Sequence, residues 1–174
     1  MPIPQKLVSY LTGKSLRHEV VPHKTVYTAF DVAATLRVPL TAIAKALLLK
    51  SDKGFLIAVL SAGHLLDMKK ITALIGAKKI RIPTEKELWE FLKKKKGALT
   101  PFGGYHKLPV FLDRKFSKNT HGFFSSGNFT ESLRIPLKHF LEAEKPKVGV
   151  FSIMRKKIAL NKTKSKIVKK KKKK

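Results

Sequence analysis

The stretch TAIAKALLLKS, residues 41–51, decides the fold class and raises the first chemical question. Read as an extended strand, it places alternate side chains on opposite faces. Lys45 then shares a face with three aliphatic side chains, those of Ile43, Leu47 and Leu49. Lys50 lies at the strand's end, where its ammonium group reaches water, but Lys45 has no such exit. Burial among aliphatic side chains disfavours a charged ammonium group unless an anion lies near.

Two interpretations of Lys45 follow from this placement. In the first, Lys45 is a lysine at the rim of a sheet and forms an ion pair with Asp67 or Asp113. In the second, it is a partly desolvated cation that holds a phosphate or stabilises negative charge developing in a reaction. The position of the ammonium nitrogen relative to these two carboxylates distinguishes the interpretations.

The segments around this strand predict an α+β fold. A second strand, 55–61, follows 44–50 after the turn sequence SDKG, which is typical of a hairpin. Strands and helices intermingle without strict βαβ alternation, which favours a mixed, largely antiparallel, curled sheet with helices packed outside. No glycine-rich phosphate loop follows the first strand, so a doubly wound nucleotide-binding fold is disfavoured. Further strands are expected at 18–22, 78–83, 110–113, 120–126, 130–135 and 147–151, and helices at 4–12, 28–38, 67–76, 84–96 and 136–144.

Helix-capping residues support these boundaries. Thr28 precedes Asp31 by three positions and predicts a start like a capping box, and Thr84 with Glu87 forms a true one. Asp67 is the expected N-cap of the helix between them. The segment GALTPFGGYHKLP, 97–109, contains three glycines and two prolines and is expected to be loop throughout.

Length and composition bound the class of protein. The chain has 174 residues with 43% hydrophobic content, enough for one domain with a real core. We expect a single domain over residues 1–154 and a basic, disordered, lysine-rich tail over residues 155–174. The absence of cysteine excludes disulfides, thiolate metal sites and thiol catalysis. The first residues carry no long apolar run, which predicts a cytoplasmic protein without a membrane segment.

The charge indicates the kind of partner. Lys and Arg number 38 against 11 Asp and Glu, a formal net charge of +27. Nine of the last fourteen residues are lysines, yet the rest of the chain is also strongly basic. A polyanion is the natural partner, and nucleic acid is favoured because each neutralised phosphate releases counterions. A solubilising surface and attraction to an anionic membrane remain the alternatives.

The segment FFSSGNFTESL, 123–133, is the second feature that could carry chemistry. Its glycine permits a positive φ or close approach of a ligand to the backbone, although a plain hairpin turn has the same composition. No Gly-x-Ser-x-Gly elbow surrounds Ser125 and Ser126, so neither is a convincing nucleophile. The six histidines are scattered, and none forms a metal-binding pair on one helix face. The residues alone therefore indicate a basic α/β protein that binds RNA.

Four segments in a particular order indicate a family. They are VPHKTVYTAFDVAATLRVPLTAIAKALLLK (21–50), AVLSAGHLLDMKKITALIGAKK (58–79), GALTPFGGYHKLPVFLD (97–113) and FFSSGNFTESLRIPLKHF (123–140). In this order they resemble the YbaK-like, prolyl-tRNA synthetase-associated family of aminoacyl-tRNA deacylases, over roughly residues 16–143. Each motif is weak alone, but their shared order and spacing are specific. The residues at the motif positions of the first segment are His23, Thr28, Asp31, Ala33, Ala44 and Lys45.

The resemblance implies a YbaK-like fold and hydrolysis of the ester that joins a wrong amino acid to the 3′ end of tRNA, without metal or cofactor. It implies a water nucleophile, helped by backbone groups of the serine–glycine loop and by the ribose hydroxyl of the terminal adenosine. Lys45 becomes the catalytic anion-binding residue, and Gly127 supplies the backbone contact. The substrate-binding residues implied by position are His23, Thr28, Ser126, Asn128, Pro101, Phe102 and Gly103.

The implied partner is misacylated tRNA, with an aminoacyl-tRNA synthetase as a second candidate and the lysine tail expected on the RNA backbone. Three residues depart from the family's pattern. Ala46 replaces a threonine beside the lysine, and Thr100 replaces a first proline. Phe129 stands near the place of a histidine, which bears on the choice of amino acid. The alternative function is a non-catalytic basic protein of the same fold that binds tRNA or the ribosome.

Overall fold

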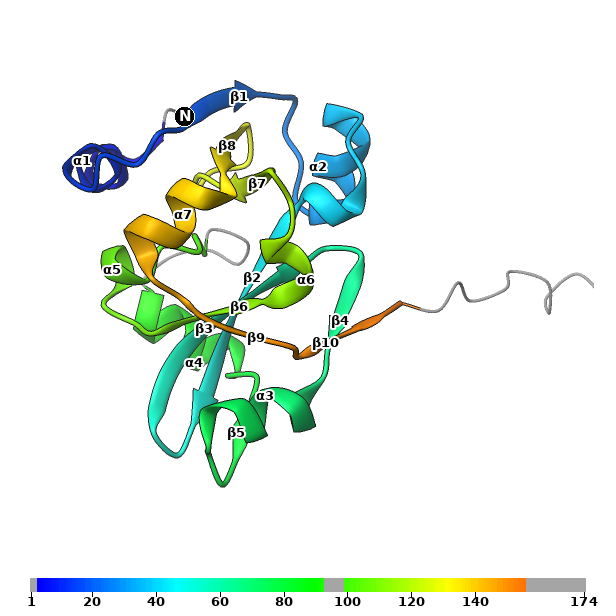
Figure 1. Cartoon of the computed structure of the whole chain (residues 1–174). Coiled ribbons are helices and arrows are strands. Elements are labelled where there is room, and N and C mark those ends of the chain that lie inside the picture. Colours follow the sequence, from blue (N-terminus) through cyan, green and yellow to red (C-terminus); the bar gives the residue numbers. More distant parts are fainter. Residues whose placement is uncertain (1–2, 93–98, 156–174) are drawn as a thin grey trace, which may run out of the picture.

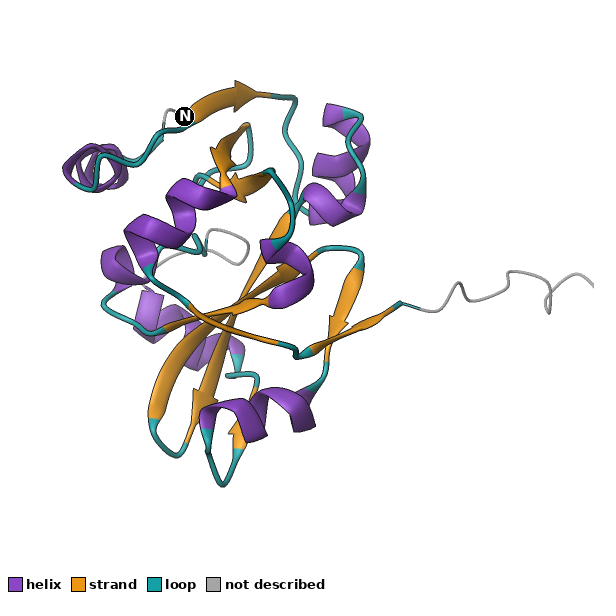
Figure 2. Cartoon of the chain, viewed as in Figure 1, coloured by secondary structure: helices purple, strands orange, loops and turns teal. Residues whose placement is uncertain are grey.

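The computed structural model describes residues 3–92 and 99–155, which form three sheets with helices around them (Figures 1 and 2). The largest sheet has five strands in the order β5–β2–β3–β6–β9. β2 pairs antiparallel with β3 and β5, whereas β6 runs parallel to both β3 and β9. The sheet is therefore mixed, as the sequence predicts. The strands are β5 (Ile80–Arg81), β2 (Ala44–Ser51), β3 (Gly54–Ser61), β6 (Val110–Asp113) and β9 (Lys147–Gly149).

A second sheet has three antiparallel strands, β1 (Glu19–Pro22), β8 (Glu131–Pro136) and β7 (His121–Ser125). It lies at one end of the molecule, while the turn of the β2–β3 hairpin lies at the other (Figure 1). A single parallel bridge between Ile43 and Phe123 joins the start of β2 to β7. This bridge brings together segments that are distant in sequence, and the candidate site lies beside it.

The third sheet is a pair of short antiparallel strands, β4 (His64–Leu66) and β10 (Ser152–Met154). Neither strand was expected from the sequence. Each has only three residues, and pairing with a partner far along the chain, rather than local composition, defines it. β10 lies beside β4 near the end of the described part of the chain. Of the expected tail over residues 155–174, only Arg155 is described, and the rest lies outside the described residues.

The helices begin and end near their expected caps. The Thr28 hydroxyl accepts a hydrogen bond from the Asp31 N–H at 3.1 Å. Glu87 accepts one from the Thr84 N–H at 2.9 Å, as a capping box requires. The helices are α1 (Gln5–Gly13), α2 (Ala29–Leu36), a 3-10 turn (Leu40–Ala42), α3 (Met68–Ile75), α4 (Glu85–Leu92), α5 (Gly103–His106), α6 (Arg114–Ser117) and α7 (Leu137–Glu144).

One prediction about loops is wrong. The segment 97–109, expected to be loop throughout, contains the helical turn α5. Gly103 begins α5 so close to Val110 and to the Leu108 carbonyl that a Cβ atom would collide with both. Gly103, one of the glycines that suggested an open loop, instead permits tight packing of a short helix against the start of β6.

Both faces of β2 are covered. Ala44, Ala46 and Leu48 pack in the main core with residues of α1, β6, β7, β8 and α7. Leu47 and Leu49 pack in a second cluster with residues of β3 and α3. Lys45 lies on the face of Leu47 and Leu49, as the alternation predicts.

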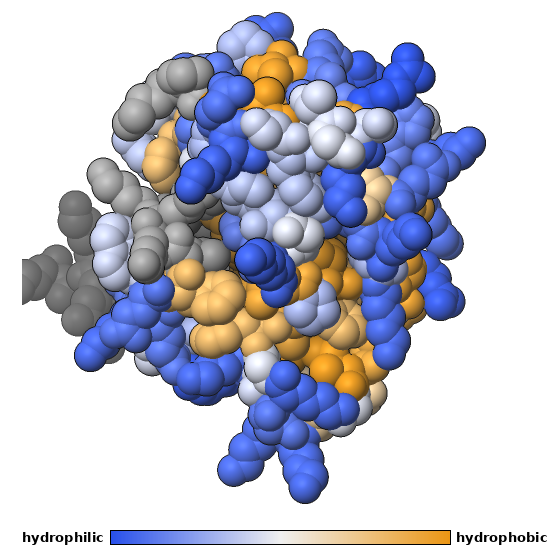
Figure 3. Space-filling model, turned by 90° about the vertical axis from the view of Figure 1, so that its left-hand side faces the viewer, coloured by the Kyte–Doolittle hydropathy of each residue, from blue (hydrophilic) through white to orange (hydrophobic). Residues whose placement is uncertain are grey.

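The surface is basic and largely polar. Figure 3 shows hydrophilic side chains around an apolar area on the face that lies to the left in Figure 1. Within residues 3–92 and 99–155, no helix is long and apolar enough to cross a membrane.

Candidate functional site

A cavity of about 170 Å³ lies where the two larger sheets meet. Its walls come from the start of β2, from β7, from the N-terminal turn of α2 and from the turn that follows β7. Apolar side chains predominate, and Lys45 is the one charged residue among the described residues that line it. The lining residues are His23, Val26, Tyr27, Thr28, Ala29, Val32, Ile43, Ala44, Lys45, Ala46, Leu99, Phe123, Phe124, Ser125, Asn128, Phe129 and Ser132.

The Lys45 ammonium group is half-buried and held by a backbone oxygen. Its Nζ donates a hydrogen bond to the His64 carbonyl at 2.8 Å. Burial lowers the pKa of Lys45 below its ordinary value, and the nearby positive charge of Arg155 lowers that pKa further. A carbonyl dipole satisfies one of the three N–H donors but leaves the positive charge uncompensated.

Neither carboxylate considered from the sequence neutralises Lys45. Asp67 caps α3, where one oxygen accepts N–H bonds from Lys69 and Lys70 at 3.1 Å. Asp113 is buried, and its two oxygens accept N–H bonds from Lys115 and Phe151 at 3.0 and 2.9 Å. Within the described part of the chain no ion pair involves Lys45. The interpretation of Lys45 as an internally paired rim lysine is therefore wrong.

His23 and Thr28 enter the cavity from the segment before α2. The His23 Nδ1 lies 2.8 Å from the Lys24 carbonyl, and its Nε2 lies 3.0 Å from the Ser132 hydroxyl. A carbonyl only accepts, so Nδ1 carries the proton, and Nε2 of the neutral ring accepts from Ser132. Thr28 caps α2 and also donates from its hydroxyl to the Asp31 carboxylate at 2.7 Å. Both side chains are thus oriented by protein partners at the cavity wall.

The turn after β7 is shaped by Gly127 and by hydrogen bonds within the turn. Gly127 has a φ of +86°, which favours glycine, and its N–H donates to the Ser125 hydroxyl at 3.3 Å. The buried Ser126 hydroxyl donates to the Glu131 carbonyl at 2.7 Å. The Asn128 side-chain oxygen accepts from the Thr130 and Glu131 N–H groups, each at 2.9 Å. Ser125 and Asn128 line the cavity, whereas Ser126 is buried and neither it nor Gly127 is among the residues of the described wall.

The loop containing Pro101, Phe102 and Gly103 contributes differently from what the resemblance implies. All three residues are buried, and Phe102 packs in the main core against aromatic rings of α1, β7 and α7. The described wall of the cavity includes none of them but does include Leu99 of the same loop. The structure thus brings Lys45, His23, Thr28 and Asn128 together around the cavity. It keeps the loop residues Pro101, Phe102 and Gly103 buried away from the cavity wall.

Sequence reasoning singled out Phe129 but missed several other residues of the wall. Tyr27, one of those missed, packs against the Phe129 ring with centroids 5.1 Å apart and keeps 71% of its surface exposed. Val26, Val32 and Leu99 supply aliphatic surface. These residues carry no local motif, because they meet only through the junction of two sheets. No group of three or more His, Asp or Glu that could hold a metal ion occurs among the described residues.

The comparisons with known proteins agree with this geometry. The model of the aminoacyl-tRNA editing domain family matches residues 23–143. The prolyl-tRNA editing protein ProX of Acetoanaerobium sticklandii is 27% identical over 120 residues, which cover 68% of this chain and 73% of that protein. A proline–tRNA ligase of Xylella fastidiosa is 35% identical over 71 residues, 41% of this chain but 13% of the ligase.

A crystal structure of a candidate trans-editing enzyme for prolyl tRNA synthetase has the same fold. It superposes with a TM-score of 0.75 at 23% identity and covers 88% of this chain and 98% of that one. The family match spans well over half of the chain and includes the residues that form the cavity, from His23 to Ser132. The chain belongs to the aminoacyl-tRNA editing domain family.

Proposed function

We propose that this protein is a free-standing aminoacyl-tRNA deacylase that acts in trans, in the cytoplasm, on tRNA carrying a wrong amino acid. The observation that carries the proposal is the Lys45 ammonium group, half-buried at the wall of the cavity and not paired with any carboxylate of the described residues. The match to ProX over 73% of its length supports a free-standing protein, whereas only 13% of the proline–tRNA ligase corresponds.

The proposed reaction is hydrolysis of the ester between the amino acid and the terminal ribose. Water attacks the carbonyl carbon, the C–O bond to the ribose breaks, and the released hydroxyl takes a proton. An aminoacyl ester is activated, so orientation and stabilisation of the oxyanion supply most of what the reaction needs. We assign the stabilising groups to backbone N–H groups of the turn around Gly127, with the substrate's own ribose hydroxyl assisting the proton transfer.

Lys45 in this proposal binds the anionic end of the substrate. The RNA supplies the negative charge that the protein withholds, so substrate binding relieves the cost of burying the ammonium group. His23, Thr28 and Asn128 orient the terminal nucleotide at the wall. The resemblance also assigns substrate contacts to Ser126, Pro101, Phe102 and Gly103, and their burial outside the described wall supports an indirect contribution through packing.

The partner in this proposal is tRNA, gripped through its backbone by the basic body and the lysine tail. Such contacts raise affinity without selecting a sequence. A synthetase that charges the same tRNA is the second partner, and the likeness to a segment of a proline–tRNA ligase supports this choice. The largely aliphatic and aromatic lining favours a small, uncharged amino acid.

A deacylation panel tests the proposal. The full chain is incubated with tRNAs mischarged with different amino acids, and release of each amino acid is followed. We expect hydrolysis of at least one, and a loss of about 100-fold in kcat/KM for Lys45→Ala, as for removal of one group that stabilises the oxyanion or its substrate. The matched control is Lys138→Ala, which removes a lysine that is 82% exposed on α7 and should leave the rate unchanged.

Two results would contradict the proposal. If wild-type protein hydrolyses no mischarged tRNA but binds tRNA, the alternative of a non-catalytic RNA-binding protein holds instead. If Lys45→Ala retains full activity, the cavity is not the site of the reaction.

A further inference from the structure

We propose that Arg155 and Lys45 together bind the phosphate that joins the last two nucleotides of the tRNA, at the rim of the editing cavity. This inference rests on the function proposed above, because it names how that site holds the 3′ end of its substrate. Arg155 lies beyond residues 23–143, so the family match gives it no role.

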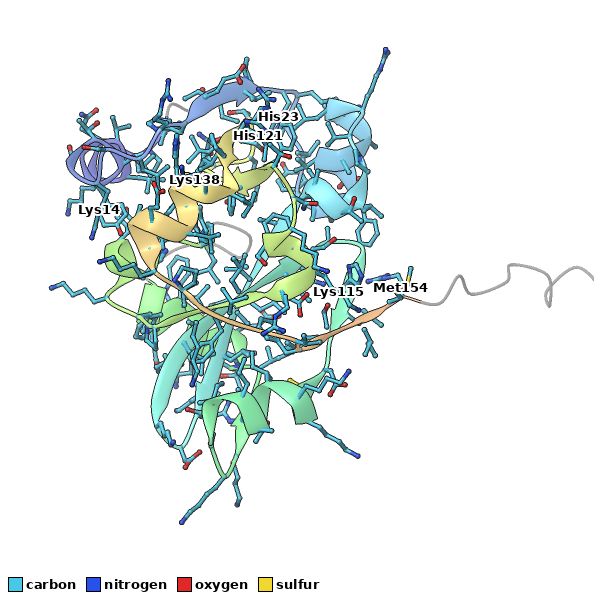
Figure 4. All side chains as sticks on the ribbon, viewed as in Figure 1. Lys14, His23, Lys115, His121, Lys138 and Met154 are labelled. Atoms are coloured by element: carbon cyan, nitrogen blue, oxygen red, sulfur yellow. The ribbon has the colours of Figure 1, made fainter. Side chains whose placement is uncertain are left out.

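Strand pairing places Arg155 next to Lys45. In the β4–β10 pair, Met154 lies opposite His64. The carbonyl of the same His64 accepts the hydrogen bond from Lys45 Nζ at 2.8 Å. Arg155 directly follows Met154, so the end of β10 brings its backbone to the place where the Lys45 ammonium group is fixed. Figure 4 labels Met154 at this end of β10.

The side chain of Arg155 lies against the first turn of α2. Its guanidinium carbon lies over the ring of Phe30, 4.9 Å from the ring centroid, a cation–π arrangement. Phe30 belongs to the first turn of α2, next to Thr28 and Ala29, which line the cavity. The ring of Phe30 thus packs against the guanidinium group and holds it between β10 and the first turn of α2, beside the residues that line the cavity.

The two cations have no carboxylate between them. Among the described residues no ion pair joins Arg155 or Lys45 to an acidic side chain. Lys115 adds a third positive group near β10, with its Nζ 3.4 Å from the Ser152 carbonyl. The nearby buried carboxylate of Asp113 is engaged by two backbone N–H groups. Arg155 contributes to the lowered pKa of Lys45, as expected for like charges in proximity.

A phosphate diester fits this arrangement better than a carboxylate of the protein. The planar guanidinium group can donate two parallel hydrogen bonds to phosphate oxygens while its face remains on the Phe30 ring. When the ester occupies the cavity, the nearest anion of an aminoacylated RNA end is the phosphate on the 5′ side of the terminal nucleoside. A single negative charge there would attract both cations at once.

The test compares two substrates, of which only one carries this phosphate. One is an aminoacylated CCA trinucleotide, and the other is aminoacylated adenosine, each carrying the amino acid that the wild-type protein hydrolyses fastest. For Arg155→Ala in the full chain we expect kcat/KM on the trinucleotide to fall about tenfold, mainly through KM, as for loss of one charge-assisted hydrogen bond. The rate on adenosine should change less than about twofold, because that substrate lacks the phosphate.

Three further variants sharpen the test. Arg155→Lys should recover part of the lost activity, because lysine keeps the positive charge but lacks the two-pronged guanidinium group. Phe30→Ala removes the ring that holds the guanidinium group, so it should lower kcat/KM on the trinucleotide but not on adenosine. Arg17→Ala removes an exposed arginine before β1 and should affect neither substrate. Equal losses on both substrates, or no loss on either, would overturn the phosphate site.

The failure of this inference is distinguishable from failure of the proposed function. If wild-type protein hydrolyses neither substrate, the proposed function fails, and binding of an uncharged RNA oligonucleotide ending in CCA then tests the phosphate site alone. Weaker binding by Arg155→Ala than by Arg17→Ala would support the site. Equal binding by these two variants would overturn it.

Discussion

At the scale of single residues, two glycines share a backbone conformation but not a location. Gly127 has a φ of +86° in the turn beside the cavity, and Gly54 has a φ of +112° in the turn of the β2–β3 hairpin. A side chain is strained in either place, whatever the space around it. They therefore form a matched pair for separating strain from chemistry.

Alanine at either glycine should lower the free energy of unfolding by about 1–2 kcal/mol, the cost of a non-glycine residue at positive φ. Only Gly127→Ala should also lower kcat for deacylation, because it displaces the backbone groups assigned to the oxyanion. Urea unfolding and steady-state kinetics on both variants provide the measurement. If Gly54→Ala lost as much activity as Gly127→Ala, the effect would be one of stability alone.

The site could be predicted in part, and the limits are physical. Alternation along 41–51 and the family resemblance both indicate Lys45, since a buried charge within an apolar run is visible in local sequence. Arg155 and Leu99 leave no such signal. Pairing of β10 with β4 places Arg155 near Lys45, and the packing of a loop brings Leu99 to the cavity wall. Both depend on contacts between distant segments.

At the scale of secondary structure elements, Glu87 ties α4 to the edge of the five-stranded sheet. Lys50 of β2 lies directly opposite Arg81 of β5, which would place two positive charges side by side. The Glu87 carboxylate accepts from Lys50 at 2.8 Å and from Arg81 at 2.7 Å, and it also caps α4 through Thr84. Hydrogen bonds from Arg81 and Lys50 hold the pKa of Glu87 well below its ordinary value.

Stability should therefore depend on pH through Glu87. The pKa of Glu87 is lowered in the folded state, so the carboxylate stabilises the fold fully at pH values above its ordinary pKa of 4.5. This contribution is lost progressively as the pH falls below 4.5 toward the lowered pKa. Glu87→Gln should be less stable than the wild type at about pH 7, and the difference should shrink by about pH 3. Urea midpoints at the two pH values measure this.

Glu90→Gln is the control on the same helix. Glu90 is 63% exposed and contacts Lys86 only at 4.0 Å, so its replacement should change neither midpoint appreciably. A Glu87→Gln midpoint that stayed equally far below the wild type at low pH would contradict the argument.

The elements themselves were largely predictable. Capping residues and the SDKG turn are local signals, and the helices α2, α3 and α4 and the β2–β3 hairpin follow them. The short elements β4, β10, α5 and α6 did not emerge from the sequence. Three or four residues carry too little periodicity, and their backbone conformation is imposed by partners elsewhere in the chain.

At the scale of the whole molecule, charge governs the encounter with RNA. A formal net charge of +27 on 174 residues produces a field that attracts a polyanion from any direction. Contacts to phosphates are screened by salt and release counterions, so they contribute affinity rather than selection. In the proposed function, the cavity, with its single lining lysine among the described residues, then selects the substrate by its ester and amino acid.

The affinity for uncharged tRNA should fall steeply as salt rises, and deletion of residues 162–174 should flatten that dependence. Each lysine that neutralises a phosphate contributes about 0.7–0.9 to the slope of log K against log salt. Filter binding or fluorescence anisotropy over a range of salt concentrations gives the slope for each protein. An unchanged slope would remove the tail from the RNA-binding surface.

The bridge between Ile43 and Phe123 has a consequence for the order of events when the protein refolds. The walls of the cavity belong to two sheets, and this bridge is where those sheets meet. A refolding chain that has formed only the β2–β3 hairpin and its neighbours would hold Lys45 in place yet leave the ester unsheltered. The recovery of hydrolysis should therefore lag behind the recovery of secondary structure. The rate at which enzymatic activity returns would then report the rate at which the three-stranded sheet docks onto the five-stranded sheet.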